Sequence, residues 1–318
     1  MRFLPTDEQR AFARSLDALL TAADTPAIVR SWSAGDHTAG QALWSRIAEA
    51  GVFAPAVPET YEGAGPLPVE LAVAFVELGR HAVPGPLVET VLAAVLLADL
   101  PERAEGLLPQ LVSGKAVATV GAPYALDGDM ADVVLALRDR QVWLSPGCRP
   151  GTKASLDPAR RLATPLPGGE LLRAGVPPSA LGWARLATAA QALGVGLALL
   201  ERTVAYVTQR VQFGVPIGSF QAVKHRLADA LTALEFARPL LFGAALTMTP
   251  ADLAAAKVAA CEAAYTTART ALQLHGAIGY TAEYDLSLWL TKARALRTAW
   301  GGPAECRAAV LSGARPRG

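Results

Sequence analysis

Apolar residues recur at intervals of three and four positions along most of this 318-residue chain, which is the spacing of amphipathic helices. The first helix is expected to begin at Thr6, a candidate N-cap that Gln9 follows three residues later, as in a capping box. Pro101 is expected to end another helix. The predicted helices after the first cover residues 39–50, 67–81, 86–100, 107–112, 180–210, 221–248, 252–275 and 283–299. The last four ranges have lengths suited to an antiparallel bundle.

The segment between these two helical parts has a different character. Short runs of β-favouring residues occur at 117–120, 133–137 and 141–144, and stretches rich in Pro and Gly follow them. A segment this short forms a small sheet at most. The sequence therefore predicts a mainly α protein with a small β insert. Its expected parts are an N-terminal helical domain at 1–115, a reduced middle β domain at 116–176 and a C-terminal helical bundle at 177–318.

Composition excludes several classes of protein. The net charge of +1 gives no electrostatic basis for binding nucleic acid. Cys148, Cys261 and Cys306 lie far apart without metal-binding spacing, which indicates a reducing, cytoplasmic location. The N-terminus is too polar for a signal peptide. No apolar stretch reaches the roughly 18 unbroken residues of a membrane span. Hydrophobic residues make up 52% of the chain, which fits closely packed helices and burial against another subunit.

The richest chemistry lies between two predicted helices, at residues 210–221. Arg210 offers charge-assisted hydrogen bonds, Phe213 and Phe220 offer aromatic faces, and Gln212 and Gln221 offer amide edges. These groups suit a ligand that carries phosphates and a flat ring. The alternative from residue types alone is a well-packed helical connection with an exposed ion pair.

The order of residues in this segment is more specific than their types. Arg-x-Gln-Phe-Gly-x-Pro-Ile-x-x-Phe-Gln at 210–221 closely resembles the signature of the acyl-CoA dehydrogenase family. A second match, Gln-Leu-His-Gly-Ala-Ile-Gly-Tyr-Thr-Ala-Glu, lies at 273–283 and continues at 290–294. Upstream matches lie at 43–51, 57–65 and 76–79. The ordered matches cover most of the chain outside roughly residues 120–178. In the family the middle position holds a considerably larger β-barrel, so the resemblance implies that this domain is truncated here.

The resemblance assigns roles to these positions. In that family the arginine, phenylalanine and glutamine of the 210–221 type of segment bind the pyrophosphate and adenine end of FAD in the neighbouring subunit, across a dimer interface. It implies that Arg210 pairs with pyrophosphate and that Gln221 reaches the adenosine. It also implies that Phe213 and Ile217 pack on the cofactor. The other cofactor-binding candidates are Gln212, Phe220, Gln273, Gly276 and Ala277.

Two of these assignments keep an alternative. The segment around Gln273 can also be a plain helix end. Arg185 matches an arginine near the acyl-CoA pocket of the family, which makes it a substrate-pocket candidate. It can equally be a solvated arginine in the first turns of a helix.

The residues for the family's own chemistry are missing. That chemistry needs a carboxylate base that removes the α-proton of an acyl thioester while a hydride passes to the flavin. Trp300 stands at one of the two family positions for the base and Ala184 at the other, and neither accepts a proton. Residues 120–129 lack the loop that contacts flavin and substrate in the family. Gly302 replaces a cofactor-holding threonine.

The chain therefore resembles the smaller, non-catalytic subunit of α2β2 heterotetrameric acyl-CoA dehydrogenases of the actinobacterial steroid side-chain type. The resemblance implies a subunit of an FAD-dependent enzyme that catalyses α,β-dehydrogenation of an acyl-CoA thioester. This chain would contribute residues to the ADP half of FAD across the interface. A homologous catalytic partner would supply the base.

Two other functions stay open. One is a self-sufficient homotetrameric dehydrogenase with a relocated base, for which Glu201 and Glu283 are the candidates. Both residues have simpler roles, as a helix-face carboxylate and as a first-turn carboxylate. The other is a flavin-free assembly or binding protein with the same fold.

Overall fold

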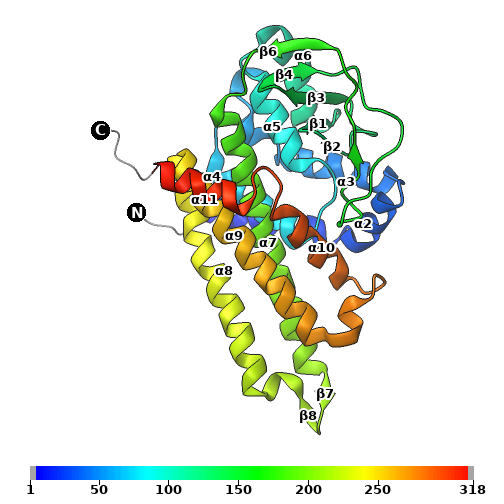
Figure 1. Ribbon diagram of the computed structural model, residues 1–318, viewed down its shortest axis with the longest axis vertical. Helices are drawn as coiled ribbons and strands as arrows, with labels where there is room; N and C mark the ends of the chain where they lie inside the picture. The colour runs from blue at the N-terminus through cyan, green and yellow to red at the C-terminus, as the bar shows by residue number, and fades with distance from the viewer. Residues whose placement is uncertain (1–4, 314–318) are drawn as a thin grey trace.

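The computed structural model describes residues 5–313, and helices dominate both ends of that range (Figure 1). The N-terminal part contains α1 (Asp7–Thr21), α2 (Thr25–Ser33), α3 (Thr38–Glu49), η1 (Ala54–Ala56), η2 (Glu59–Tyr61), α4 (Pro68–Arg80), α5 (Leu87–Leu97) and α6 (Pro101–Val112). The predicted capping box is confirmed. The backbone N–H of Gln9 donates to Thr6 Oγ1 at 3.2 Å, and that of Thr6 donates to Gln9 Oε1 at 2.9 Å.

The prediction that Pro101 ends a helix was wrong. Pro101 is the first residue of α6, where its fixed φ and missing N–H cost nothing, and α5 ends at Leu97. α2 was not predicted at all. It begins after Asp24, which has a φ of 49° and makes no capping hydrogen bond with its side chain, and Pro26 lies in its first turn. The helix has only nine residues, too few to repeat an apolar spacing over several turns.

The middle segment forms one six-stranded sheet. Its strands are β1 (Ala118–Gly121), β2 (Ala125–Leu126), β3 (Val133–Arg138), β4 (Gln141–Leu144), β5 (Leu162–Ala163) and β6 (Glu170–Arg173). They lie in the order β5-β2-β1-β3-β4-β6, and only the β1–β3 pair is parallel. The buried strand β1 contacts α5, where Thr90 Oγ1 donates to the carbonyl of Ala118 at 2.7 Å. This bond ties the sheet to the N-terminal helices.

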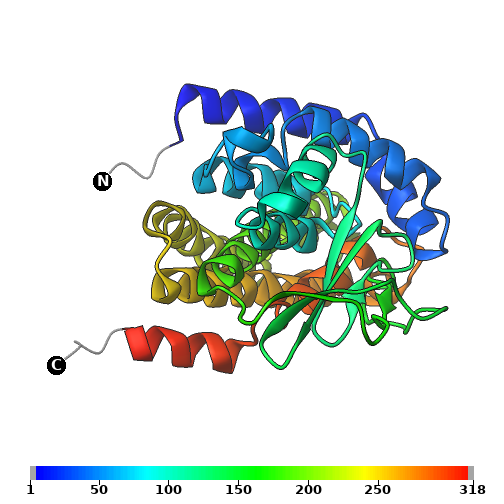
Figure 2. The ribbon, with the colours of Figure 1, turned by 90° about the horizontal axis from the view of Figure 1, so that it is seen from above.

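The C-terminal part is a helical bundle. It contains α7 (Pro178–Gln209), β7 (Val211–Gln212), β8 (Val215–Pro216), η3 (Ile217–Ser219), α8 (Gln221–Thr247), α9 (Pro250–His275), η4 (Gly276–Tyr280), α10 (Leu286–Leu296) and α11 (Pro303–Gly313). In Figure 1 the long helices α7, α8 and α9 run side by side, away from the sheet. Figure 2 shows α1 and α11 at opposite edges of the molecule. The predicted fold class is confirmed, while the exact domain boundaries stay a prediction.

Two helices, α7 and α8, are long and apolar enough to cross a membrane by length and composition. The sequence criterion did not select them because each run contains polar residues. Of the apolar window of α7, 94% is buried inside the protein, which is the behaviour of a core helix. For α8 the value is 33%. α8 therefore has a large exposed surface, and its exposed large apolar residues are Leu231, Phe236, Leu240 and Leu246.

Candidate functional site

A tight hairpin carries the predicted residues between α7 and α8. β7 pairs with β8 through Gln212 and Val215, and Phe213 and Gly214 form the turn with φ of 55° and 79°. Positive φ at both central positions is the signature of a type I′ turn. Glycine adopts this conformation freely, whereas a phenylalanine in it is strained. Figure 1 places the hairpin at the end of the bundle farthest from the six-stranded sheet.

The side chains of this hairpin face solvent. Phe213 is 92% exposed, and its ring lies edge-on to that of Phe220 at a centroid distance of 6.3 Å. Arg210, Gln212 and Gln221 are also exposed, and Ile217 is half-buried. Within residues 5–313, the Arg210 guanidinium has no hydrogen-bond or ion-pair partner. The predicted binding groups therefore point outward rather than into a cleft of their own chain.

The second predicted segment lies where α9 ends. Gln273, Gly276 and Ala277 are exposed there. Gly276 has a φ of 62° and a ψ of −138°, a conformation that side chains disfavour, and no atom lies within 4 Å of where its Cβ would stand. The glycine is therefore required by the backbone. It also leaves the main chain open to approach by a ligand.

Tyr206 joins the two segments. It lies one helical turn before Arg210 and accepts the backbone N–H of that residue at its carbonyl oxygen, at 2.9 Å. Its hydroxyl donates to the carbonyl of His275 at 3.3 Å, and the two rings stack at 4.2 Å. Tyr206 also lines a shallow cleft of about 250 Å³ with Arg202 and Tyr284. The structure thus brings both segments to one end of the bundle, through a residue that the sequence did not single out.

A second region surrounds Trp300, one of the two residues predicted to stand at a base position. Trp300 lines a cleft of about 390 Å³, hereafter the Trp300 cleft, between the sheet, α5, α7 and the start of α11. Its indole Nε1 donates to Glu89 Oε1 at 3.1 Å. The Glu89 side chain is 4% exposed, and Arg160 Nη2 lies 4.0 Å from the same oxygen. The ring of Trp300 is half-buried rather than enclosed.

Arg185 faces this cleft from α7. Its Nη2 pairs with Glu305 Oε1 at 2.5 Å, and its Nε donates to the carbonyl of Trp300 at 3.4 Å. It also borders a neighbouring apolar cleft of about 610 Å³. Ala184, at the other base position, is fully buried. Arg185 is therefore not a free, solvated arginine.

The two glutamates considered as relocated bases lie elsewhere. Glu201 Oε2 pairs with Arg80 Nη2 at 3.0 Å, on the face where α4 meets α7. Glu283 is exposed before the start of α10. Neither lines the Trp300 cleft. The carboxylate that does so from a buried position is Glu89, which sequence reasoning missed because it comes from α5, 211 positions before Trp300.

A buried polar network lies behind Glu89. Asp127 accepts the Trp32 indole N–H at 3.1 Å, and burial is the main cause that raises the pKa of Asp127 to about 8. Nearby, Lys292 Nζ lies 3.9 Å from Asp157 Oδ2 and donates to a backbone carbonyl. Burial lowers the pKa of Lys292. These groups connect the β insert to the N-terminal helices and to α10.

Comparison with known proteins gives matches over nearly the whole chain. The model described as "Acyl-CoA dehydrogenase, N-terminal domain" matches residues 6–115, and that described as "Acyl-CoA dehydrogenase, C-terminal domain" matches residues 175–313. The chain is 35% identical to acyl-CoA dehydrogenase IpdE2 of Mycobacterium tuberculosis over 91% of its own length and 92% of that protein. It is 33% identical to IpdE2 of Mycolicibacterium smegmatis, over 94% of its own length and 96% of that protein.

A solved structure is similar along its full length. A chain of the ChsE4-ChsE5 complex from Mycobacterium tuberculosis superposes with a TM-score of 0.85 at 26% identity, covering 99% of this chain and 100% of the other.

Proposed function

The chain belongs to the acyl-CoA dehydrogenase family, and we propose that it is the non-catalytic subunit of an FAD-dependent acyl-CoA dehydrogenase. In this proposal a homologous partner supplies the base and the platform for the flavin ring. This chain supplies residues to the ADP half of the partner's FAD, in an α2β2 assembly. The reaction is α,β-dehydrogenation of an acyl-CoA thioester.

The observation that carries the proposal is the outward direction of the hairpin. Arg210 is exposed without a partner among residues 5–313, and Phe213 is 92% exposed in a strained turn. A non-glycine residue at positive φ costs on the order of 1–3 kcal/mol, and such residues cluster at binding and catalytic sites. A pyrophosphate on Arg210 and a flat surface on Phe213 would satisfy both groups.

The residues present fit FAD in this role. Arg210 would hold the pyrophosphate, Gln221 and Gln273 would offer amide edges to the adenosine, and the open backbone at Gly276 would admit close approach. Phe213, Phe220 and Ile217 would cover the cofactor. Bound FAD supplies the hydride acceptor. These groups bind and orient it, and none of them removes a proton.

The Trp300 cleft supports the absence of a second catalytic centre. The family resemblance gives the base position to Trp300, whose indole donates to Glu89, and Arg160 Nη2 lies 4.0 Å from the same Glu89 oxygen. Arg185 forms an ion pair with Glu305, so its guanidinium is not free to bind a substrate. These contacts leave the cleft without a carboxylate at either family base position.

The relatives support a heteromeric partner. The ChsE4-ChsE5 structure is, by its description, a complex of two proteins, and IpdE2 is described as an acyl-CoA dehydrogenase. On α8, Phe236 is 72% exposed and Leu246 is 53% exposed, and such residues are typical of a surface that another subunit covers. We extend the proposal to the steroid-degrading type of this family and to a cytoplasmic location.

Co-expression tests the proposal. The chain purified alone should carry little flavin and be inactive, whereas the complex with its partner should hold about one FAD per heterodimer. Flavin absorbance and acyl-CoA-dependent flavin reduction measure both. Stoichiometric FAD with turnover from this chain alone would overturn the proposal. A complex without any flavin would favour the flavin-free assembly protein instead.

Glu89 favours a second candidate, a self-sufficient enzyme with a relocated base. It is a buried carboxylate in the Trp300 cleft, held by a hydrogen bond to Trp300. If this chain alone is active, Glu89→Gln should reduce flavin reduction by about 10²–10⁴-fold. Glu305→Gln is the matched control, because it removes an exposed carboxylate from the same cleft. Equal effects of both changes would exclude Glu89 as the base.

A further inference from the structure

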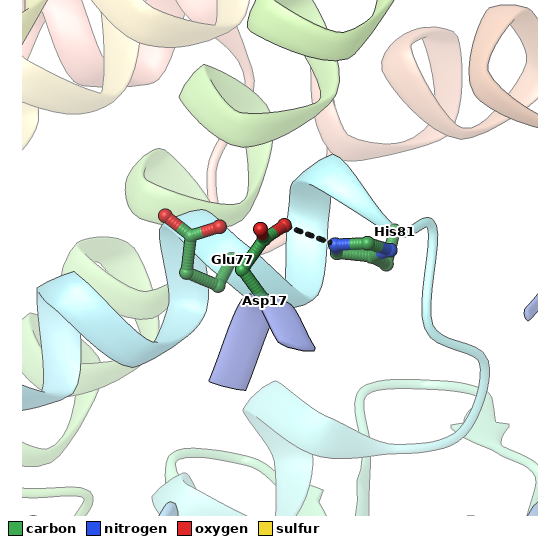
Figure 3. A group of neighbouring side chains, drawn as sticks. All are labelled: Asp17, Glu77 and His81. Carbon is green, nitrogen blue, oxygen red and sulfur yellow. Dashed lines mark hydrogen bonds and ion pairs between the residues drawn. The ribbon is translucent and has the colours of Figure 1, made fainter. Parts of the chain in front are cut away.

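Three metal-ligating side chains meet where α1 crosses the end of α4. Glu77 lies in the last turn of α4, His81 directly follows that helix four positions later, and Asp17 comes from α1. One ligand atom of each lies within 4.8 Å of the others. Figure 3 shows the Asp17 carboxylate between the other two, with His81 Nε2 at 2.8 Å from Asp17 Oδ1.

The chemistry of this set suits a divalent transition-metal ion. Two carboxylates and one imidazole provide oxygen and nitrogen ligands, and zinc binds such atoms at about 2.0–2.2 Å. A tetrahedral ion separates its ligand atoms by about 3.4 Å, from those bond lengths. The observed separations, 2.8 Å between His81 Nε2 and Asp17 Oδ1 and at most 4.8 Å within the set, lie around that value. Water would complete the coordination.

The burial of these three side chains and their access to solvent also suit a metal site. The side chains of Glu77 and His81 are 14% and 17% exposed, so little water competes for them. The side chain of Asp17 is 51% exposed, so an ion can reach it from solvent. A single carboxylate with two partly buried neighbours can close over an ion with little rearrangement of the backbone.

The positive charges near Glu77 do not neutralise all the carboxylates around it, so a cation can bind there. Arg80 Nε lies 3.4 Å from Glu77 Oε2, but the same guanidinium pairs with Glu201 at 3.0 Å. Arg238 also acts on Glu77 from α8, and it pairs with Glu235 at 3.1 Å. The nearby positive charges are thus divided among several carboxylates. Burial is the main cause that raises the pKa of Glu77 to about 7, and the charges of Asp17 and Glu201 add to it.

We propose that Asp17, Glu77 and His81 bind one divalent transition-metal ion of the zinc type, and that this ion fastens α1 to α4. The other end of α1 already has a polar link to α4, in which Gln9 Nε2 donates to Glu70 Oε1 at 2.9 Å. Between the two ends, Leu16 and Leu20 bury the apolar side of α1. The metal completes the attachment of the N-terminal helix, and it takes no part in dehydrogenation.

Zinc itself is the probe. The full-length chain, purified with its partner and stripped with a chelator, should bind zinc in calorimetry. Asp17→Asn, Glu77→Gln and His81→Gln should each remove one zinc per chain, or weaken its binding by more than the roughly 10–100-fold expected from losing only an outer-shell partner. Asp17→Asn changes an exposed side chain, so it tests the site without endangering the fold. His225→Gln is the control, because it removes an exposed imidazole of α8.

A thermal melt gives an independent readout. Saturating zinc should raise the melting temperature of the wild-type complex and of His225→Gln, and should leave the three cluster variants unchanged. Zinc binding that is equal in the wild type and in Asp17→Asn would overturn the proposal. So would the absence of a zinc site in the wild type, which would leave the His81–Asp17 contact as a simple hydrogen bond.

Discussion

The indole of Trp300 donates a hydrogen bond to the buried carboxylate of Glu89, at 3.1 Å and across 211 positions of sequence. The residue predicted to stand at a family base position is thus the partner of a carboxylate from another helix. A buried carboxylate needs such donors, because an unpartnered one costs the full desolvation free energy. The pair therefore has a structural role whether or not the cleft receives a substrate.

Trp300→Phe isolates this hydrogen bond, because it keeps an aromatic ring and removes the donor. The free energy of unfolding should fall by about 1–3 kcal/mol. Trp300→Ala should cost more, but less than the ~3–5 kcal/mol of a fully buried ring, since Trp300 is half-buried. Denaturant titration measures both. Flavin reduction in the complex should be unchanged, and its loss with stability and FAD content intact would make Trp300 catalytic.

Arg210→Ala should weaken FAD retention in the co-expressed complex. It removes a charge-assisted bond to phosphate, worth about 1.5–3 kcal/mol. Gln273→Ala should act in the same direction and more weakly. Flavin released on dilution is the measurement, and Arg14→Ala, which changes an exposed arginine of α1, is the control. Equal retention in the two arginine variants would remove Arg210 from the cofactor site.

Phe213→Gly separates the stability of the chain from its binding role. Glycine relieves the positive φ of 55°, so thermal stability of the folded chain should stay equal or rise. FAD retention in the complex should nevertheless fall, because the exposed ring is gone. Phe213→Tyr should retain FAD. If Phe213→Gly keeps both its thermal stability and its bound FAD, the Phe213 ring does not cover the cofactor.

Asp127 should make stability depend on pH in a defined direction. Its carboxyl has a pKa of about 8 in the folded protein against 3.8 as the reference value. Between these values the unfolded chain has released the proton that the folded chain keeps. Stability from this group is therefore complete below about pH 4 and is lost as the pH rises toward 8.

Asp127→Asn should flatten this dependence, because the amide is never charged and asparagine tolerates the φ of 50° at this position. The melting temperatures of the wild type and of Asp127→Asn, measured from pH 5 to pH 8, show whether the pH dependence differs between them. Parallel curves would mean that Asp127 is ionised in the folded state at every pH tested.

The long helices could be predicted from sequence because each repeats its apolar spacing over several turns. α11 could not, since Gly301, Gly302 and Pro303 read as a loop and only Cys306 is fully buried on it. α2 was missed because its nine residues are too few to repeat an apolar spacing over several turns, although Pro26 lies in its first turn. Three strands of the small sheet were predicted from the sequence. The two-residue strands β2 and β5 are too short to show a periodicity of their own.

Some residues of the candidate site could likewise be predicted from the sequence, and others could not. The order of residues at 210–221 was sufficient to nominate Arg210 and its neighbours, although their role in binding stays a prediction. Contacts between distant elements left no local pattern. Glu89 with Trp300 is one example, and the Asp17–His81 contact, 64 positions apart, is another.

The exposed apolar residues of α8 have a consequence for how cells make this protein. Phe236 is 72% exposed, and a copy without a partner would present it and its neighbours to chaperones, proteases and other unfinished chains. If the proposed partner covers these residues, mass action would link the lifetime of this chain to the concentration of that partner. A surplus of this chain would be degraded or would aggregate. Selection would accordingly act on the ratio in which the two chains are synthesised, and a shared transcript is the simplest way to fix it.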